Sequence, residues 1–242
     1  MRKKQKILTI VGGTFFGIGI ILGFILASIM VWGDLEASLF TSGNRADKSL
    51  ATLKCPIVIT SSETGYITAE LNNPTTKPLE RYLIANISEG YASLVREIRT
   101  NLPIPPEQKQ KVEWKIYPED AAFRDRVILF RVYINPRYPH PSLGANCGVV
   151  RLNVDGITGN QIVSSASFFA LVSMGFGAVM VELGSRSSPN RSRNAIRNGY
   201  ALAGVLIGAA IISYMGVWVL GFTLLAVSLL MVVILVTRKL IG

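Results

Sequence analysis

The sequence predicts an α+β membrane protein in which four transmembrane helices carry one extracytoplasmic antiparallel β-sandwich domain, inserted between the first and second helices. The first observation is three apolar runs without charged residues, at 7–33, 161–181 and 198–237. A bilayer core of roughly 30 Å takes about 20 helical residues, so the first two runs each make one span and the third makes two. The second observation is the polar segment between the first two runs, which is long enough for an independent core.

These runs divide the chain into six segments. They are a cytoplasmic N-terminus with the first helix (1–33), the extracytoplasmic domain (34–160), the second helix (161–183), a basic cytoplasmic loop (184–198), a helical hairpin (199–237) and a cytoplasmic tail (238–242). In the hairpin, Gly216 is the expected turn residue, because glycine tolerates a positive φ.

Basic residues at the ends of the spans predict the orientation. They are Arg2, Lys3, Lys4, Lys6, Arg186, Arg191, Arg193, Arg197, Arg238 and Lys239. With four spans all of them lie on one side, and an excess of Lys and Arg marks the cytoplasmic side. We therefore expect a protein of the plasma or cytoplasmic membrane, with both termini inside. These residues are 10 of the 25 Lys and Arg, so the net charge of +10 reflects topology, and no nucleic-acid partner is expected.

Small residues recur at a spacing of four in the apolar runs. The pairs are Gly13 with Gly17, Gly19 with Gly23, Ser173 with Gly177, and Gly204 with Gly208. This spacing places both members on one helix face, where two backbones can approach closely. We expect these residues to mediate helix packing, either within the four-helix bundle or against another protein.

Within 34–160, six short segments have the composition of strands: 56–60, 65–71, 79–87, 111–117, 127–134 and 148–154. Alternation is clearest where Val112, Trp114 and Ile116 interleave with charged residues, and a period of two is typical of half-buried antiparallel strands. Segment 89–101 has apolar residues at helical spacing and is expected to be a short helix, with a long edge strand as the alternative.

The two cysteines, Cys55 and Cys147, lie near the two ends of the predicted strand region. In an oxidising compartment an even number of cysteines favours a disulfide over free thiols. In strand rhythm, and with Trp114 between the two cysteines, residues 55–154 resemble an immunoglobulin-like or fibronectin-like sandwich. That resemblance implies a fold only, because such sandwiches serve many functions.

One loop combines residues that are common at protein interfaces. Segment 135–144 contains Arg137, Tyr138 and His140 together with three prolines. A preorganised loop loses little conformational entropy on docking. Binding of a partner protein by these three side chains is therefore a hypothesis, and a rigid connection with a solvated histidine is the alternative.

The sequence shows no motif for catalysis or for a cofactor. It lacks a phosphate-binding glycine loop and a nucleophile elbow, and its single histidine cannot form a metal site without carboxylates. We expect a non-catalytic accessory or scaffold subunit without cofactor or metal, whose partners are membrane lipids and other membrane or extracytoplasmic protein subunits. The alternative is a membrane-embedded enzyme or transporter component that binds a lipid or solute between its helices.

Overall fold

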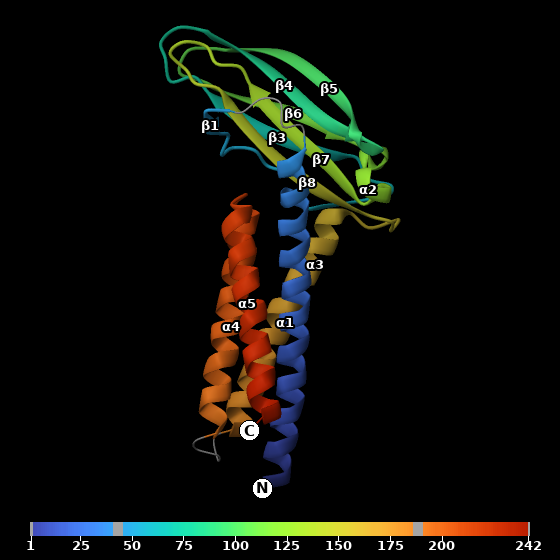
Figure 1. Cartoon of the computed structure of the whole chain (residues 1–242), viewed down its shortest axis with the longest axis vertical. Coiled ribbons are helices and arrows are strands. Elements are labelled where there is room, and N and C mark those ends of the chain that lie inside the picture. Colours follow the sequence, from blue (N-terminus) through green and yellow to red (C-terminus); the bar gives the residue numbers. More distant parts are fainter. Residues whose placement is uncertain (1, 41–45, 186–190, 242) are drawn as a thin grey trace. The chain divides into compact units, whose positions relative to one another are not determined.

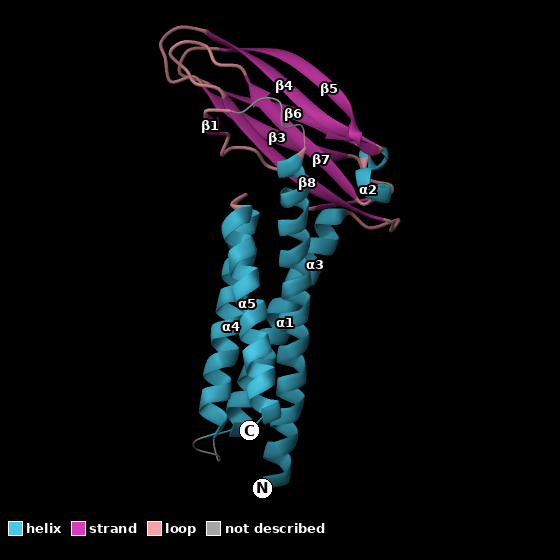
Figure 2. Cartoon of the chain, viewed as in Figure 1, coloured by secondary structure: helices cyan, strands magenta, loops and turns pink. Residues whose placement is uncertain are grey.

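The computed structural model describes residues 2–40, 46–185 and 191–241. The chain folds into two compact units, one of Met1–Val31 with Val163–Gly242 and the other of Trp32–Ile162. The first unit is helical and the second contains all the strands that the structure describes (Figures 1 and 2). The protein is therefore of the α+β class, as predicted.

The helical unit is built from four helices. They are α1 (Arg2–Leu39), of which the last turns belong to the other unit, α3 (Gly159–Ser185), α4 (Arg191–Tyr214) and α5 (Trp218–Ile241). One apolar cluster joins Ala27, Leu206 and Leu225 of α1, α4 and α5, and a second joins Met174 of α3 to Ala203 of α4. Gly216, with a φ of 78°, lies in the turn between α4 and α5. The predicted basic loop falls partly on 186–190, outside the described residues.

Two described helices are long and apolar enough to cross a membrane. They lie at Lys4–Leu39 and Gly159–Ser185, and a shorter apolar helical stretch covers Trp218–Ile234. In each of the two long helices only 17% of the most apolar window is buried. Such low burial is unlike the core helix of a soluble protein, which is apolar because it is enclosed.

The described residues of the second unit form eight strands in two sheets. The larger sheet has the order β1 (Lys48–Ser49), β8 (Leu143–Leu152), β7 (Val127–Ile134), β4 (Leu79–Glu89) and β5 (Tyr91–Ile104), and β2 (Val58–Thr60) also pairs with β8. The smaller sheet pairs β3 (Gly65–Asn72) with β6 (Lys109–Ile116). A short turn, η1 (Pro118–Asp120), and the four-residue α2 (Ala122–Asp125) connect β6 to β7.

Both sheets contribute to one hydrophobic core. The inward residues of β3 and β6 cluster with those of β4, β7 and β8. Trp114 of β6 meets Phe130 of β7, with their ring centroids 5.3 Å apart. The alternation that predicted these strands is the alternation between this core and solvent, because successive side chains of a strand point to opposite faces.

The larger sheet is mixed, so the prediction of a purely antiparallel domain was wrong. β1 runs parallel to β8 at Leu143 and Gly144, and β2 runs parallel to β8 at 150–152. Parallel pairing requires a long connection, which the intervening strands supply here. An alternating pattern shows which residues of a strand face the core, but it does not show whether the neighbouring strand runs parallel or antiparallel. The prediction was wrong for this reason.

The predicted helix at 89–101 was also wrong, since these residues form most of β5. β4 and β5 pair as a long hairpin that turns at Gly90, whose φ is 71°. Pairing along the whole of β4 outweighs a local helical spacing of apolar residues. Pro103 fits into β5 because β5 is an edge strand of the sheet, where a residue without an N–H is tolerated.

Candidate functional site

The connection between β7 and β8 forms the centre of the candidate site. It begins at Asn135, whose N–H donates to the carbonyl of Tyr82 at 2.9 Å. Arg137 and His140 then bond to each other through both backbone N–H groups, at 3.0 and 2.6 Å, and the Tyr138–Pro139 peptide bond between them is cis. The loop is therefore a tight, hydrogen-bonded turn whose ends are fixed by the β7–β8 pairing.

The three residues expected to bind a partner have different surroundings in this turn. The Arg137 guanidinium donates to the carbonyl and the carboxylate of Glu80, at 3.2 and 3.3 Å. The Tyr138 side chain is 98% exposed, and His140 is half-buried. The fold therefore displays Tyr138 and turns His140 toward a different feature, a cleft beside the loop.

This cleft has a volume of ≈ 390 Å³. Its walls come from the β1 segment, the ends of β3, β4 and β5, and the turn that contains His140 and Pro141. Much of the lining is apolar, including Leu71, Ile104 and Leu143. Among its lining residues are also three basic ones, Lys48, Arg81 and His140.

Arg81 is the functional candidate that sequence reasoning missed. It is only 3% exposed. It lies on the inward face of β4, the face on which Leu83, Ala85 and Ile87 are fully buried. Its Nη2 donates to the carbonyl of Pro141 at 2.9 Å, whereas Nη1 is buried without a hydrogen-bond partner in the part of the chain that the structure describes. Burial lowers the pKa of the Arg81 guanidinium from its ordinary value. The sequence did contain a signal for it. Arg81 is separated by two, four and six residues from Leu83, Ala85 and Ile87 of the predicted strand, so it is expected on the same inward face.

The β1 side of the cleft is held in place by Asp47. Its carboxylate accepts hydrogen bonds from the hydroxyl and the N–H of Ser142, at 2.6 and 3.1 Å. These two bonds lower the pKa of Asp47, the hydroxyl contributing most. Asp47 therefore binds Ser142, and Arg81 binds the carbonyl of the preceding residue, Pro141.

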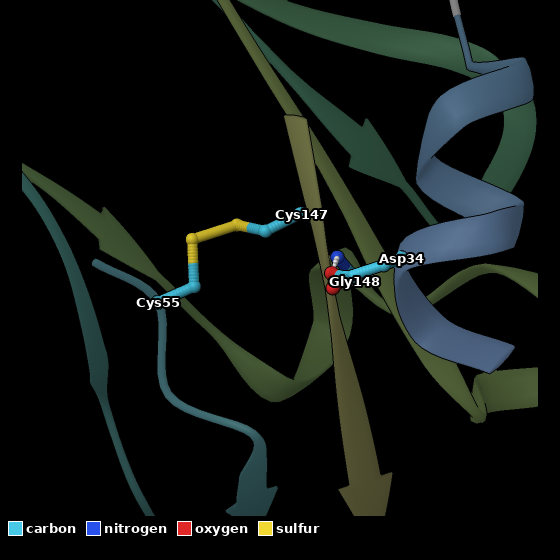
Figure 3. The surroundings of a disulfide bond; sticks show 4 residues. All are labelled: Asp34, Cys55, Cys147 and Gly148. Atoms are coloured by element: carbon cyan, nitrogen blue, oxygen red, sulfur yellow. Dashed lines mark hydrogen bonds between the residues drawn. A yellow bond between two sulfur atoms is a disulfide. The ribbon is translucent and has the colours of Figure 1, made fainter. Parts of the chain in front are cut away.

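The predicted disulfide between Cys55 and Cys147 is present, with 6.6 Å between the two Cα atoms (Figure 3). It joins the segment before β2 to β8. Figure 3 also shows the hydrogen bond from the Gly148 N–H to the Asp34 carboxylate, at 3.4 Å, where the end of α1 packs on β8. A Cβ added to Gly148 would lie 2.0 Å from the carbonyl oxygen of Gly33, so this contact requires glycine.

The small residues proposed for helix packing fall into two groups. Gly19, Gly23 and Gly177 lie against a neighbouring helix, and an added Cβ at Gly177 would be 2.4 Å from the Phe16 nitrogen. Ser173 is half-buried on α3. An added Cβ would meet no described atom within 4 Å at Gly13, Gly17, Gly204 and Gly208. Gly12, which the four-residue spacing did not select, packs directly against the backbone of α3.

No protein-family model matches the chain, and no curated protein matches it. The solved structures with some similarity include Bacteroides uniformis β-glucuronidase 2, at 13% identity and a TM-score of 0.30 over 36% of this chain and 11% of that one. The CARDB domain of the PF1109 protein from Pyrococcus furiosus has 8% identity and a TM-score of 0.31, over 42% of this chain and 90% of the domain. The alkylpurine DNA glycosylase AlkC of Pseudomonas fluorescens has 13% identity and a TM-score of 0.29, over 40% and 30% of the two chains. Similarity at this level carries no argument about function.

Proposed function

We propose that this protein is a non-catalytic accessory or scaffold subunit of a membrane complex, and that its β-rich unit binds a partner protein outside the cytoplasm. The observation that carries the proposal is Tyr138, an aromatic side chain 98% exposed on a turn closed by its own backbone hydrogen bonds. Exposed tyrosines held on a rigid backbone are frequent anchors of protein interfaces, because they bury a large area at little entropic cost.

The membrane part of the proposal places four spans, with both termini in the cytoplasm and 34–160 outside. Its support is the apolar outer surface of the helices, where Phe168, Phe169 and Leu230 are each at least 60% exposed. A soluble protein rarely leaves such a surface uncovered. The disulfide supports an oxidising location for the β-rich unit, because cytoplasmic thiols are normally kept reduced.

The proposed fold of the outer unit is a β-sandwich similar to immunoglobulin-like domains. Its support is the shared core of the two sheets and the packing of Trp114 on Phe130. The parallel strands β1 and β2 and the position of the disulfide distinguish it from the usual pattern of such domains.

The test is native mass spectrometry of the complex purified in mild detergent from the native membrane. We expect Tyr138→Ala with Arg137→Ala to reduce the occupancy of the partner at least about tenfold, as interface anchors do. Tyr91→Ala is the matched control, since Tyr91 is 69% exposed at the β4–β5 turn. If the double variant kept the same partner occupancy and the same melting curve, the loop would not bind the partner and would only connect β7 to β8.

A further inference from the structure

Arg81 has an unusual position for a charged side chain. It lies on the core side of β4, is 3% exposed, and lines the cleft beside the β7–β8 loop. One of its terminal nitrogens is satisfied by the Pro141 carbonyl, and the other, Nη1, is buried and has no partner among the described residues. A buried donor without an acceptor costs free energy, so a site that contains one is incomplete without another group.

No acid described in the structure neutralises this cation. The ion pairs among the described residues do not include Arg81. Glu70, which lines the cleft, pairs with Lys109 at 3.2 Å. The Asp47 carboxylate accepts two hydrogen bonds from Ser142 through one oxygen, and it forms no ion pair with Arg81 among the described residues. Buried charges are normally paired, so an unpaired guanidinium at a cleft points to an anion that comes from outside the chain.

The surroundings of Arg81 indicate what kind of anion fits. Lys48 is exposed and His140 half-buried on the cleft lining, and they add basic groups to that of Arg81. Leu71, Ile104 and Leu143 provide an apolar wall. A volume of ≈ 390 Å³ falls in the range of sites for small organic ligands. A guanidinium is well suited to carboxylate and phosphate oxygens, to which it donates parallel hydrogen bonds.

We propose that the cleft binds a small organic oxyanion, a carboxylate or phosphate carried on an apolar group, with Arg81 as its buried anchor and Lys48 and His140 as supporting basic residues. The oxyanion accepts a hydrogen bond from Nη1 of Arg81. The apolar group packs on Leu71, Ile104 and Leu143. This binding requires no partner protein, so it is independent of the function proposed above.

The experiment is isothermal titration calorimetry with the full-length protein in an uncharged detergent. The probes are benzoate and phenyl phosphate, with benzamide as the neutral analogue of benzoate and inorganic phosphate as the anion without an apolar group. We expect saturable binding of at least one aromatic anion, weaker binding of inorganic phosphate, and none of benzamide. Absence of saturable binding of every probe at about 10 mM would overturn the proposal, since a Kd above that is not a specific site.

Variants connect the binding to Arg81. Arg81→Met keeps an unbranched apolar stem without the charge or the donors, and is expected to weaken binding at least about tenfold. Lys48→Gln, at an exposed position, is expected to weaken it about threefold. Lys115→Gln, at an exposed position on β6, is the control and leaves the affinity unchanged. Equal affinity in folded Arg81→Met and wild type would overturn the proposal.

Should Arg81→Met fail to fold, Arg81→Lys and Lys48→Gln decide the question. Arg81→Lys keeps the charge but loses the planar donor pair, so it too is expected to bind at least about tenfold more weakly. Wild-type affinity in both folded variants would contradict the proposal.

A lipid headgroup and a soluble metabolite share this chemistry, and a competition experiment separates the two sources. Dihexanoyl phosphatidylglycerol is added to protein bound to phenyl phosphate, with dihexanoyl phosphatidylcholine as the zwitterionic control. Displacement by the anionic lipid alone identifies a headgroup as an occupant of the cleft. No displacement by either lipid identifies a soluble anion. Displacement by both lipids equally would show that the site does not select for an anion and would count against the proposal.

Discussion

Asp120 is the residue at which three elements of the β-rich unit are tied together. Its carboxylate accepts a hydrogen bond from the Tyr117 N–H at 2.8 Å and pairs with Arg96 of β5 at 2.5 Å. Its backbone carbonyl accepts from the Ser88 hydroxyl of β4, and the same hydroxyl oxygen accepts from the N–H of Leu129 in β7. One short turn thus satisfies polar groups on β4 and β5, and the Ser88 hydroxyl links β7 to the same point, which fixes the end of the sheet.

Burial is the main influence on the Asp120 carboxyl, and it raises its pKa despite the opposing effects of the Tyr117 N–H and Arg96. The folded state therefore holds this proton more tightly than the unfolded state does. The resulting stabilisation is complete below the ordinary pKa of 3.8 and is lost as pH rises through the higher folded-state pKa.

We predict that Asp120→Asn removes this part of the pH dependence. The amide oxygen can still accept from Tyr117, but the side chain no longer titrates. Melting temperatures of the full-length protein from pH 4 to 7 check this, with Glu89→Gln, at an exposed position on β4, as the control. If the melting temperatures of the wild type and of Asp120→Asn changed with pH at the same slope, Asp120 would not be the group responsible.

At the scale of elements, the packing of α1 on α3 depends on glycines that face each other. An added Cβ at Gly12 would lie 2.9 Å from the Gly177 carbonyl oxygen, and one at Gly177 would lie 2.6 Å from the Gly12 carbonyl oxygen. Gly184 approaches Thr9 and the Gln5 carbonyl in the same way. Close backbone approach increases van der Waals contact, which is the principal attraction between helices in an apolar medium.

Gly177→Leu is predicted to force α1 and α3 apart, because the new side chain would meet backbone atoms that cannot move aside. Overpacking costs about 1–3 kcal/mol, so we expect the melting temperature to fall by about 5 °C. Gly175→Leu is the matched control, since Gly175 is exposed on the same helix and has no atom within 4 Å of an added Cβ. Equal melting of the two variants would show that Gly177 is not a packing residue.

At the scale of the whole molecule, the proposed topology determines which surfaces face the cytoplasm. We predict that a membrane-impermeant maleimide labels Thr76→Cys on intact cells and labels Lys4→Cys only after permeabilisation. Both positions are exposed, and the native cysteines are joined in the disulfide and do not react. Labelling of Lys4→Cys on intact cells, and of Thr76→Cys only after permeabilisation, would show that the topology is the reverse of the proposed one.

The α+β class, the disulfide and six strands were predictable from sequence because each depends on a local pattern or on the redox chemistry of two residues. Lys111 to Ile116, for example, alternates strictly and pairs with β3 over its full length. Parallel pairing of β1 and β2, and the extended state of 89–101, depend on partners far away in the chain. The inward position of Arg81 was indicated by its phase with the apolar residues of β4, but its cleft was not, because the cleft exists only when β1, β5 and the 135–142 turn come together.

The position of β8 determines the order in which the β-rich unit can assemble during synthesis. β8 is the last strand made, yet β1, β2 and β7 all pair with it, and it carries Cys147. Cys55 is synthesised 92 residues before its disulfide partner, so the bond cannot form until most of the unit has been made. The early strands β1 and β2 lack the strand with which they pair until synthesis of the unit is nearly finished. We therefore expect this unit to close in one late step, and a chain truncated before β8 to expose an unpaired β7 edge to chaperones and proteases.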